Sequence, residues 1–424
     1  MARRPEYLFH HNPPIDPEVS NAVFYNRNDE IQEAIHTLDV PDLAPLIYAV
    51  HGDSRTGKSH LVQRVLRLLA NRFVNVTVNA NAAGDARAAL ERAFFALKTE
   101  LDGLSNLAPD DDGMLAHDVV DPWRRYFDGM APLIEGRVDE VTLKVSKTIR
   151  DQVTGKLGLP PLSSANVSLE LSQTLEVART DEHSLTIKKP LDRVLVLHLR
   201  ELVDVLFYAT RRRVLLYFDD LDLLALGGMR GPATGQKEAA QLLHLLGPLA
   251  ESPRVAVIGS MRTAFFQVGD KALRDFAHVR KVGDGFLRNV YRLHVEQLND
   301  GIPVFTDACL EAIIRMSAGR VGVFLRLCER VVRFARRKTP VDVEHLDGWL
   351  SQEIEDWTGT PETAQVVGRI VEAVQSGALE VPGEGIDVED GPLAFTLVRR
   401  GDRGKVEVVE RTARLIRERV ADRG

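Results

Sequence analysis

Eight consecutive residues near the start of the chain combine two glycines, a lysine and a serine in a spacing that suits phosphate chemistry. They are Gly52, Asp53, Ser54, Arg55, Thr56, Gly57, Lys58 and Ser59, and His60 follows. Glycines let backbone N–H groups curl around phosphate oxygens, and a helix that starts here adds its N-terminal dipole. The lysine would reach the β- and γ-phosphates, and the serine hydroxyl would bind Mg²⁺. The segment is a full Walker A match, so we predict that residues 52–60 bind ATP and that Ser59 is a metal ligand.

A pair of acidic residues ends an apolar run further along the chain. Residues 214–218 are Val-Leu-Leu-Tyr-Phe, Asp219 and Asp220 come next, and Asp222 lies close behind. A carboxylate at the tip of a buried strand can hold the water shell of Mg²⁺, and we assign that role to Asp219. Asp220 is placed to polarise the attacking water as a general base. The alternative, a strand that merely ends in a polar turn, explains the three acids less well.

Together the two motifs resemble those of the AAA+ and STAND ATPases, especially the origin-recognition-like branch. The resemblance implies that the segment around Arg27 packs near the adenine, although Asn26 stands where the family usually has glycine. It also implies that Ser260 or Arg262, in the sensor 1 strand, lies beside the γ-phosphate. Three stretches carry these weaker matches: residues 25–31, 255–262 and 317–322.

Several arginines follow from the same resemblance. In ring-forming relatives a finger arginine completes a neighbour's active site, and Arg280 and Arg288 are the candidates here, with Arg274 behind them. We place Arg280 first, while a solvated surface role stays the alternative for each. The resemblance leaves the sensor 2 residue open between Arg320 and Arg326.

The elements that must position these residues alternate between strand and helix. We expect strands at 46–50, 73–78, 214–218, 254–258 and 289–295. We expect helices at 28–38, 58–69, 86–101, 191–211 and 235–250. Strict alternation of this kind predicts a parallel sheet covered by helices.

The alternation stops between about 103 and 190. Helical patterns resume at 120–155, and alternating apolar residues at 167–177 and 185–187 predict a β-hairpin inside an insertion. Beyond the sheet region, helices are expected at 306–338, 341–357, 362–376 and 410–420, a hairpin from 393–398 and 405–409, and a loop or wing tip at 380–390.

We therefore predict an α/β P-loop NTPase fold of the AAA+/STAND type with a parallel sheet core. An α-helical and β-hairpin insertion, a helical lid and a small C-terminal domain complete it, and a winged helix is one form that this last domain could take. The expected boundaries are an irregular lead-in at 1–24, a core at 25–300 with its insertion at about 103–190, a lid at 301–340 and a C-terminal domain at 341–424.

Composition narrows the remaining classes. The chain has 424 residues, a formal net charge of −7 and two cysteines, Cys309 and Cys328, which are too few for a disulfide framework or a zinc site. Both cysteines fall in apolar helical patterns, which predicts buried free thiols. An apolar run long enough to span a membrane and a signal peptide are both missing, so we expect a cytoplasmic protein with no membrane partner.

Two functions are consistent with the predicted ATPase core. In the first, ATP turnover drives a switch that self-assembles or recruits a protein partner, as STAND relatives do in bacterial defence and conflict systems, with residues 160–189 of the insertion as the recognition surface. In the second, the chain engages DNA as initiators and transposition regulators do. The acidic net charge favours the first function. Two basic segments favour the second function: the tail at 399–423 and the lid helix, whose basic residues are Arg330, Arg333, Arg336, Arg337 and Lys338.

Overall fold

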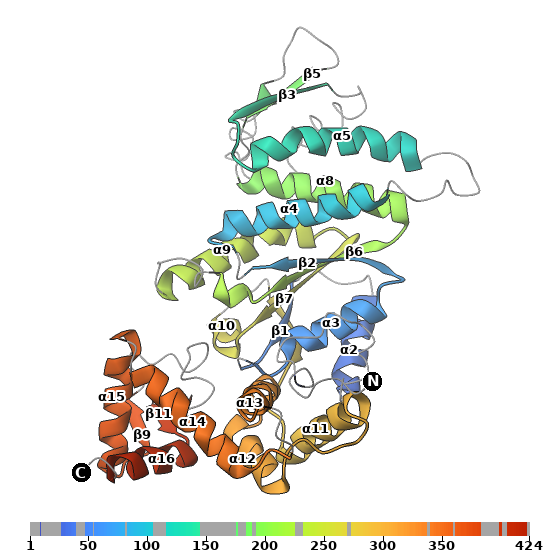
Figure 1. The fold of residues 1–424 in the computed structure, drawn as a ribbon. Coiled ribbons are helices and arrows are strands. Elements are labelled where there is room, and N and C mark those ends of the chain that lie inside the picture. The colour runs from blue at the N-terminus through green and yellow to red at the C-terminus, as the bar shows by residue number, and fades with distance from the viewer. Residues whose placement is uncertain are drawn as a thin grey trace. The chain divides into compact units, whose positions relative to one another are not determined.

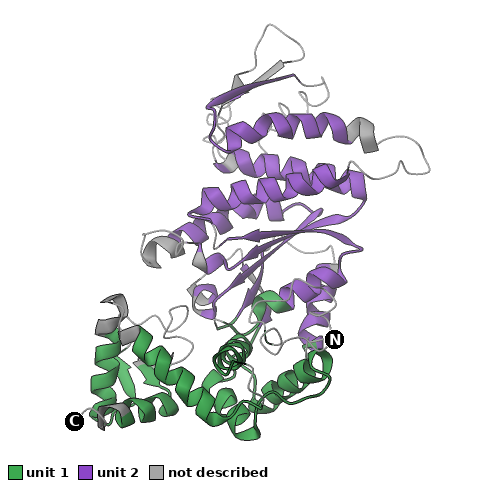
Figure 2. Cartoon of the chain, viewed as in Figure 1, with its two compact units in different colours: residues 1–27, 52–60, 279–424 green, residues 28–51, 61–278 purple. Residues whose placement is uncertain are grey.

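The chain forms two compact units in the computed structural model, coloured separately in Figure 2. Unit 1 comprises residues 1–27, 52–60 and 279–424, and unit 2 comprises residues 28–51 and 61–278. The structure describes residues 9, 27–39, 47–53, 55–80, 83–104, 116–144, 175–176, 184–188, 192–224, 232–268, 273–336, 340–358, 361–382, 398–400 and 405–421.

Unit 2 is built on a parallel sheet, which confirms the predicted fold class. Its described strands run in the order β2-β6-β7-β1-β8, and every neighbouring pair is parallel. The carboxyl ends of β1, β6 and β7 therefore meet at one edge of the sheet. The strands are β1 (Ile47–His51), β2 (Phe73–Asn79), β6 (Arg213–Asp219), β7 (Val255–Met261) and β8 (Leu273–His278).

Helices close over this sheet where the sequence predicts them. In unit 2, α4 packs on β2 and against α8, as Figure 1 shows. The first turn of α4 is capped by Asp85, whose carboxylate accepts a hydrogen bond from the N–H of Ala88 at 2.8 Å. The helices are α2 (Asn28–Asp39), α3 (Lys58–Leu68), α4 (Ala86–Gly103), α8 (Asp192–Thr210), α9 (Pro232–Ala250) and α10 (Thr263–Val268).

The insertion contains α5 (Ala116–Ile134) and a small antiparallel sheet in the order β3-β5-β4. The predicted helix at 120–155 is wrong at residues 140–144, because β3 (Glu140–Lys144) is a strand, and residues 145–155 lie outside the described residues. Its residues alternate in burial, and a Cβ placed on Gly129 of α5 would lie only 2.3 Å from the Leu143 side chain. The alternating burial of its residues and its packing against α5 therefore make this segment a strand instead of the predicted helix.

The predicted hairpin is confirmed where it is described. The strands β4 (Leu175–Glu176) and β5 (Ser184–Lys188) pair antiparallel, with Leu175 opposite Ile187. Residues 167–174, the first part of that prediction, lie outside the described residues.

The predicted strand at 289–295 is wrong, because this segment lies inside α11 (Asp284–Leu298). Its buried side chains recur at helical spacing: Leu287, Val290, Tyr291, His294 and Val295. The last strand of the sheet is β8 instead.

Unit 1 is mainly helical, with a three-stranded antiparallel sheet in its described C-terminal part, ordered β10-β11-β9. The helices are α11, α12 (Asp307–Ser317), α13 (Val321–Phe334), α14 (Val343–Thr358), α15 (Pro361–Gln375) and α16 (Glu410–Ala421). The strands are β9 (Glu380–Pro382), β10 (Val398–Arg400) and β11 (Lys405–Val408).

The C-terminal predictions hold in part. The second strand of the expected hairpin is β11, which pairs with β10, but β10 overlaps the expected first strand at 393–398 only at Val398, and residues 393–397 lie outside the described residues. The expected helices at 362–376 and 410–420 are α15 and α16. The predicted loop at 380–390 is wrong at its start, because Glu380–Pro382 pairs with β11, and residues 383–390 lie outside the described residues. Cys309 and Cys328 are buried free thiols, as expected.

Phe9 belongs to an aromatic cluster in the core of unit 1. The Phe9 side chain is fully buried, and its ring stacks on those of Tyr291 and His294 at centroid distances of 6.0 and 5.8 Å. Phe9, in the predicted irregular lead-in, is therefore a core residue that the composition of this segment did not predict. Among the described helices, none is long and apolar enough to cross a membrane.

Candidate functional site

The Walker A segment is a tight loop in unit 1 whose backbone needs two left-handed residues. Arg55 has φ of 61° and Gly57 has φ of 99°, and glycine adopts that second value without steric cost. Gly52 is required for a different reason: a Cβ there would lie 2.3 Å from the carbonyl oxygen of Val279. Ser54 lies outside the described residues.

The lysine of this loop is buried and folds back over it. Only 7% of the Lys58 surface is exposed, and its Nζ donates to the carbonyl oxygens of Gly52 at 3.2 Å and Asp53 at 2.9 Å. The Thr56 hydroxyl also donates to the Asp53 carbonyl, at 2.9 Å. A buried ammonium needs such oxygens to offset its desolvation. These bonds hold the positive charge at the loop, where an anionic ligand could take over the role of the carbonyl oxygens.

Ser59 and His60 follow Lys58 in the first turn of α3. The first backbone N–H groups of a helix have no partner within the helix and, with the helix dipole, favour an anion at this end. A buried lysine and a helix N-terminus thus occur within three residues of one another.

Arg27 fastens the loop to the rest of unit 1. Its guanidinium is almost fully buried and donates to the carbonyl oxygens of Thr56 at 3.2 Å and Arg280 at 3.4 Å. It also lies 5.8 Å from the centre of the Phe286 ring. Arg280, the predicted finger, contributes its carbonyl here, while its own side chain is exposed.

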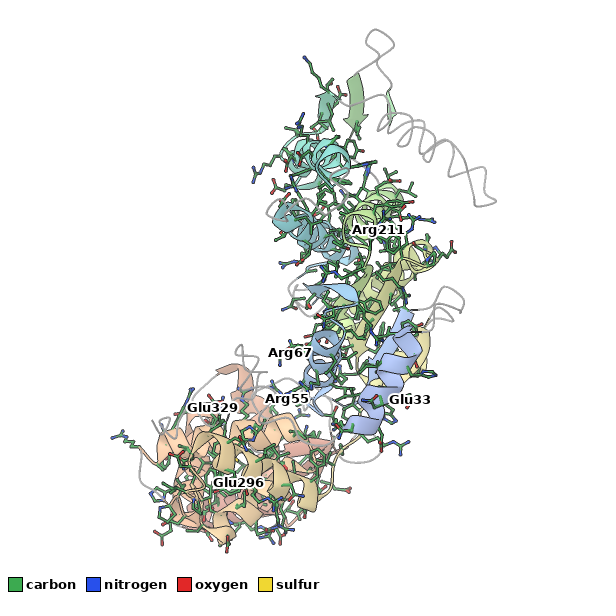
Figure 3. All side chains as sticks on the ribbon, turned by 90° about the vertical axis from the view of Figure 1, so that its right-hand side faces the viewer. Glu33, Arg55, Arg67, Arg211, Glu296 and Glu329 are labelled. Carbon is green, nitrogen blue, oxygen red and sulfur yellow. The ribbon has the colours of Figure 1, made fainter. Side chains whose placement is uncertain are left out.

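The turn before α13 lies directly against the loop. Ala318 and Gly319 have φ values of 49° and 75°, and a Cβ on Gly319 would lie 2.5 Å from the Val282 carbonyl oxygen. The N–H of Gly322 then donates to the carbonyl oxygen of Arg55 at 2.9 Å. Figure 3 labels Arg55 on the loop and Glu329 on α13. The phosphate loop and the first turn of α13 are therefore hydrogen-bonded to each other.

The two sensor 2 candidates occupy different positions on α13. Arg320 is buried at the N-cap, next to the turn that contacts the loop. Arg326 lies further along, where burial and the charge of Arg330 lower the pKa of its guanidinium. Arg320 is thus the candidate beside the loop.

The predicted acids lie together at the end of β6 in unit 2. The carboxylate oxygen Oδ1 of Asp219 accepts hydrogen bonds from the Tyr217 hydroxyl at 2.5 Å and the Ser260 hydroxyl at 2.7 Å. The backbone N–H of Asp220 donates to the same Ser260 hydroxyl at 2.8 Å. The structure thus brings together three predicted residues, Asp219, Asp220 and Ser260, and adds Tyr217, which the sequence pattern indicates only as part of an apolar strand.

Two of the remaining predicted arginines pair with acidic side chains. Arg262 pairs with Asp222, whose side chain is almost fully buried. Arg288 binds Glu311 with two hydrogen bonds of 2.6 and 2.7 Å. The side chain of Arg274 lies outside the described residues. The sequence does carry a signal for the Asp222 partner of Arg262, because Asp222 lies three residues after Asp219 in the same acidic segment.

Comparison with known proteins finds only distant structural similarity. No protein-family model and no curated protein matches the chain. Among solved structures, the chain is similar to Cdc6p from Pyrobaculum aerophilum, with 11% identity, a TM-score of 0.44 and 99% of each chain covered. It is similar to the Aeropyrum pernix ORC2 protein in its ADPNP–ADP complexes, with 11% identity, a TM-score of 0.45 and the same coverage.

A third likeness is more limited. The RuvB Holliday junction branch migration motor of Thermotoga maritima has 10% identity and a TM-score of 0.26, over 51% of this chain and 83% of that one. Values this low assign no function. The chemistry must be argued from the residues described above.

Proposed function

We propose that this chain binds ATP together with Mg²⁺ and hydrolyses it to ADP and phosphate. The phosphate loop is the observation that carries the proposal. Its left-handed residues, the close approach at Gly52 and the buried Lys58 ammonium are the features that a phosphate-binding loop needs.

The strand ends support the same proposal. The phosphate loop begins at Gly52, directly after the last residue of β1, and β6 and β7 end at the same edge of the sheet as β1. Ligands of open α/β sheets bind at the carboxyl ends of the strands. The acids at the end of β6 therefore lie at the edge of the sheet where a ligand is expected.

The proposed reaction is attack of water on the γ-phosphorus, with cleavage of its bond to the bridging oxygen. Lys58 and the loop N–H groups offset phosphate charge, and Asp220 orients and deprotonates the water. Ser59 and Asp219 offer a hydroxyl and a carboxylate, the hard oxygen donors that Mg²⁺ prefers. The bound ion would neutralise charge that develops on the phosphate oxygens.

We further propose that nucleotide state is read out by a protein partner or by self-association. The bond between Gly322 and Arg55 links the phosphate loop to α13, so a change in the loop on ATP binding or hydrolysis would be passed to the helices of unit 1. A role in bacterial defence, as in the STAND proteins that the motifs resemble, is part of this proposal.

The DNA-engaging alternative receives less support, because several of the basic residues that favoured it have acidic partners. Arg330 pairs with Glu353 at 2.8 Å and Arg333 with Glu329 at 2.5 Å on α13. In α16, Arg411 and Arg414 both bind Asp347, at 2.5 and 2.9 Å. Arg337 and Lys338 lie outside the described residues. A guanidinium already held by a carboxylate has less to gain from a phosphate.

Nucleotide binding tests the first step. We expect Lys58→Ala to weaken binding of a fluorescent ATP analogue by at least about tenfold, because it removes the buried ammonium of the loop. Lys144→Ala, an exposed position on β3, is the matched control and should bind normally. Equal affinity of the wild type and Lys58→Ala would refute the site.

Asp220→Asn separates binding from chemistry. The variant should bind ATP as the wild type does and lose on the order of 10²–10⁴ in turnover, because only the base is removed. Unchanged turnover would show that another group activates the water.

A further inference from the structure

The metal-side carboxylate of unit 2 is held by two hydroxyl groups. Tyr217 and Asp219 are two residues apart on β6, so both side chains lie on the same face of the sheet. On the neighbouring strand, Phe218 lies opposite Gly259, which places Ser260 beside Asp219. The residue types at these three positions bring two hydroxyl donors to one carboxylate.

Both donors reach the same oxygen. Asp219 Oδ1 accepts from Tyr217 at 2.5 Å and from Ser260 at 2.7 Å. The Tyr217 and Ser260 side chains are fully buried, and hydrogen bonds from buried hydroxyls to a carboxylate are short and strong. Two such bonds to one oxygen fix the rotation of the carboxylate about its bond to Cβ.

We propose that Tyr217 and Ser260 are positioning residues that orient the Asp219 carboxylate for the metal ion. The inference rests on the proposed function, because it takes Asp219 as the metal-side acid. Mg²⁺ demands near-ideal octahedral geometry, so a carboxylate that must bind it or its water shell gains from being held in one rotation. Partners that orient a metal-binding group in this way act as its outer shell.

Ser260 has a second task in the same arrangement. Asp220 adopts φ of 54°, a left-handed conformation that costs a non-glycine residue energy, and its N–H is held by the Ser260 hydroxyl at 2.8 Å. One hydroxyl thus donates to Asp219 and accepts from Asp220. It links the orientation of the metal-side acid to the backbone of the proposed base.

This arrangement changes the role expected for Ser260. Ser260 donates its single hydroxyl proton to Asp219 Oδ1, so this proton is not available to a γ-phosphate while that bond exists. Under this proposal Ser260 affects the phosphate indirectly, by orienting the Asp219 carboxylate and holding the backbone of Asp220.

Metal affinity tests the proposal without relying on activity. The experiment measures Mn²⁺ binding to the 424-residue chain at saturating ADP by electron paramagnetic resonance, and ADP binding in EDTA alongside it. Tyr217→Phe removes only the hydroxyl, and we expect it to weaken Mn²⁺ binding about 10- to 100-fold, as loss of an outer-shell partner does. ADP affinity in EDTA should stay unchanged.

Tyr126→Phe is the matched control. Tyr126 is another fully buried tyrosine of unit 2, and its hydroxyl lies 3.4 Å from His198 on α8. This variant should bind Mn²⁺ as the wild type does. Equal loss in both variants would show a general packing effect and overturn the assignment of Tyr217.

A double-mutant comparison adds a readout that a purely structural role would not move. In an Asp219→Asn background, Tyr217→Phe should cost no further Mn²⁺ affinity, because the carboxylate that it orients is gone. An additive loss would overturn the proposal.

Serine variants keep the proposal testable if Tyr217→Phe does not fold. Ser260→Ala should weaken Mn²⁺ binding at least about tenfold, because it removes an outer-shell partner, and Ser260→Thr should restore it, because threonine keeps the hydroxyl. A loss of less than about twofold in Ser260→Ala would contradict the inference, since outer-shell partners contribute more than that. If Asp219→Asn itself leaves Mn²⁺ affinity unchanged, the metal assignment fails and the inference with it, whereas nucleotide binding through Lys58 can still hold.

Discussion

At the scale of single residues, the two glycines of the phosphate loop are needed for different physical reasons. Gly57 supplies a backbone conformation that side chains disfavour, with φ of 99° and open space where a Cβ would stand. Gly52 supplies space, because the Val279 carbonyl occupies the position of its missing Cβ. The Walker A pattern therefore encodes both a torsion angle and a close contact.

Gly52→Ala tests the contact. The added methyl group would meet a backbone oxygen at 2.3 Å, so the loop must shift. We expect ATP-analogue affinity to fall at least about tenfold and unfolding stability to fall by about 1–3 kcal/mol, the usual cost of overpacking.

The control for this substitution is Gly84→Ala, because no atom lies within 4 Å of a Cβ placed there. It should bind normally. If Gly52→Ala binds the analogue as tightly as Gly84→Ala, the described loop conformation is not the binding one.

Residue types in the sequence were enough to predict which side chains gather, but not what each one contacts. Asp219, Asp220 and Ser260 lie together as the motifs implied. The resemblance places Ser260 or Arg262 beside the γ-phosphate, and the contacts that the sequence did not predict are the pairing of Arg262 with Asp222 and the bond from Ser260 to Asp219. Tyr217 was missed because tyrosine suits a buried strand for its ring alone, and its hydroxyl gains a role only once the i and i+2 positions of β6 are seen on one face.

At the scale of secondary-structure elements, the buried strands were predictable because parallel strands covered on both faces are continuous apolar runs. The edge strand β8 was not, since Leu-Arg-Asp-Phe-Ala-His carries the charges that edge strands tolerate. The hydrophobic residues at 289–295 led us to predict the last strand there instead, although the buried residues of this segment follow helical spacing. Only the tertiary packing separates these two cases.

The helices α5 and α8 enclose a histidine that makes unit 2 sensitive to acid. His198 is 2% exposed, and burial lowers its pKa from 6.5 to about 4. Below about pH 6.5 the unfolded chain binds a proton that the folded chain excludes, so stability falls as pH drops towards 4 and is unaffected above that window. The loss attributable to this residue approaches about 3 kcal/mol at the low end.

His198→Gln should flatten this part of the stability profile. Gln does not titrate, so the difference in unfolding free energy between variant and wild type should shift in favour of the variant between pH 6.5 and 4, as measured by urea denaturation. Parallel profiles for the two proteins would show that His198 does not titrate in this way.

The N-terminal segment contributes an element-scale contact that the sequence did not reveal. Phe9 is fully buried against Tyr291 and His294, in a stretch whose Pro and Asn content suggested an irregular lead-in. Phe9→Ala should destabilise unit 1 by about 3–5 kcal/mol, the cost of removing a buried ring.

Hydrogen exchange locates that effect. Amides of α11 and α12 should exchange faster in Phe9→Ala, while those of the parallel sheet in unit 2 should not change. Phe9→Leu, which keeps most of the volume, should show a smaller effect. Unchanged exchange in α11 would mean that the segment does not anchor there.

At the scale of the whole molecule, charge and ion pairing favour a protein partner over DNA. The net charge is −7, and the arginines of α13 and α16 named above are paired with Glu329, Glu353 and Asp347. We expect no salt-sensitive retention of duplex DNA at physiological ionic strength, measured by fluorescence anisotropy of a labelled duplex. Binding that weakens steeply with salt and is lost on truncation at residue 358 would instead support the DNA-engaging alternative.

The overall architecture followed from the sequence because strand and helix patterns alternate, whereas the division into two units did not. The phosphate loop belongs by its contacts to unit 1, although it connects β1 and α3 in the middle of the alternating pattern. Bonds such as that of Gly322 to Arg55 join residues more than 250 positions apart, which periodicity cannot reveal.

Steady-state ATP hydrolysis by the purified chain with Mg²⁺, measured beside Lys58→Ala, is the decisive test of the proposed ATP site. We expect turnover that Lys58→Ala abolishes and that duplex DNA does not change, because we propose that the buried ammonium of this loop holds the phosphates. Turnover that survives unchanged in Lys58→Ala would contradict it.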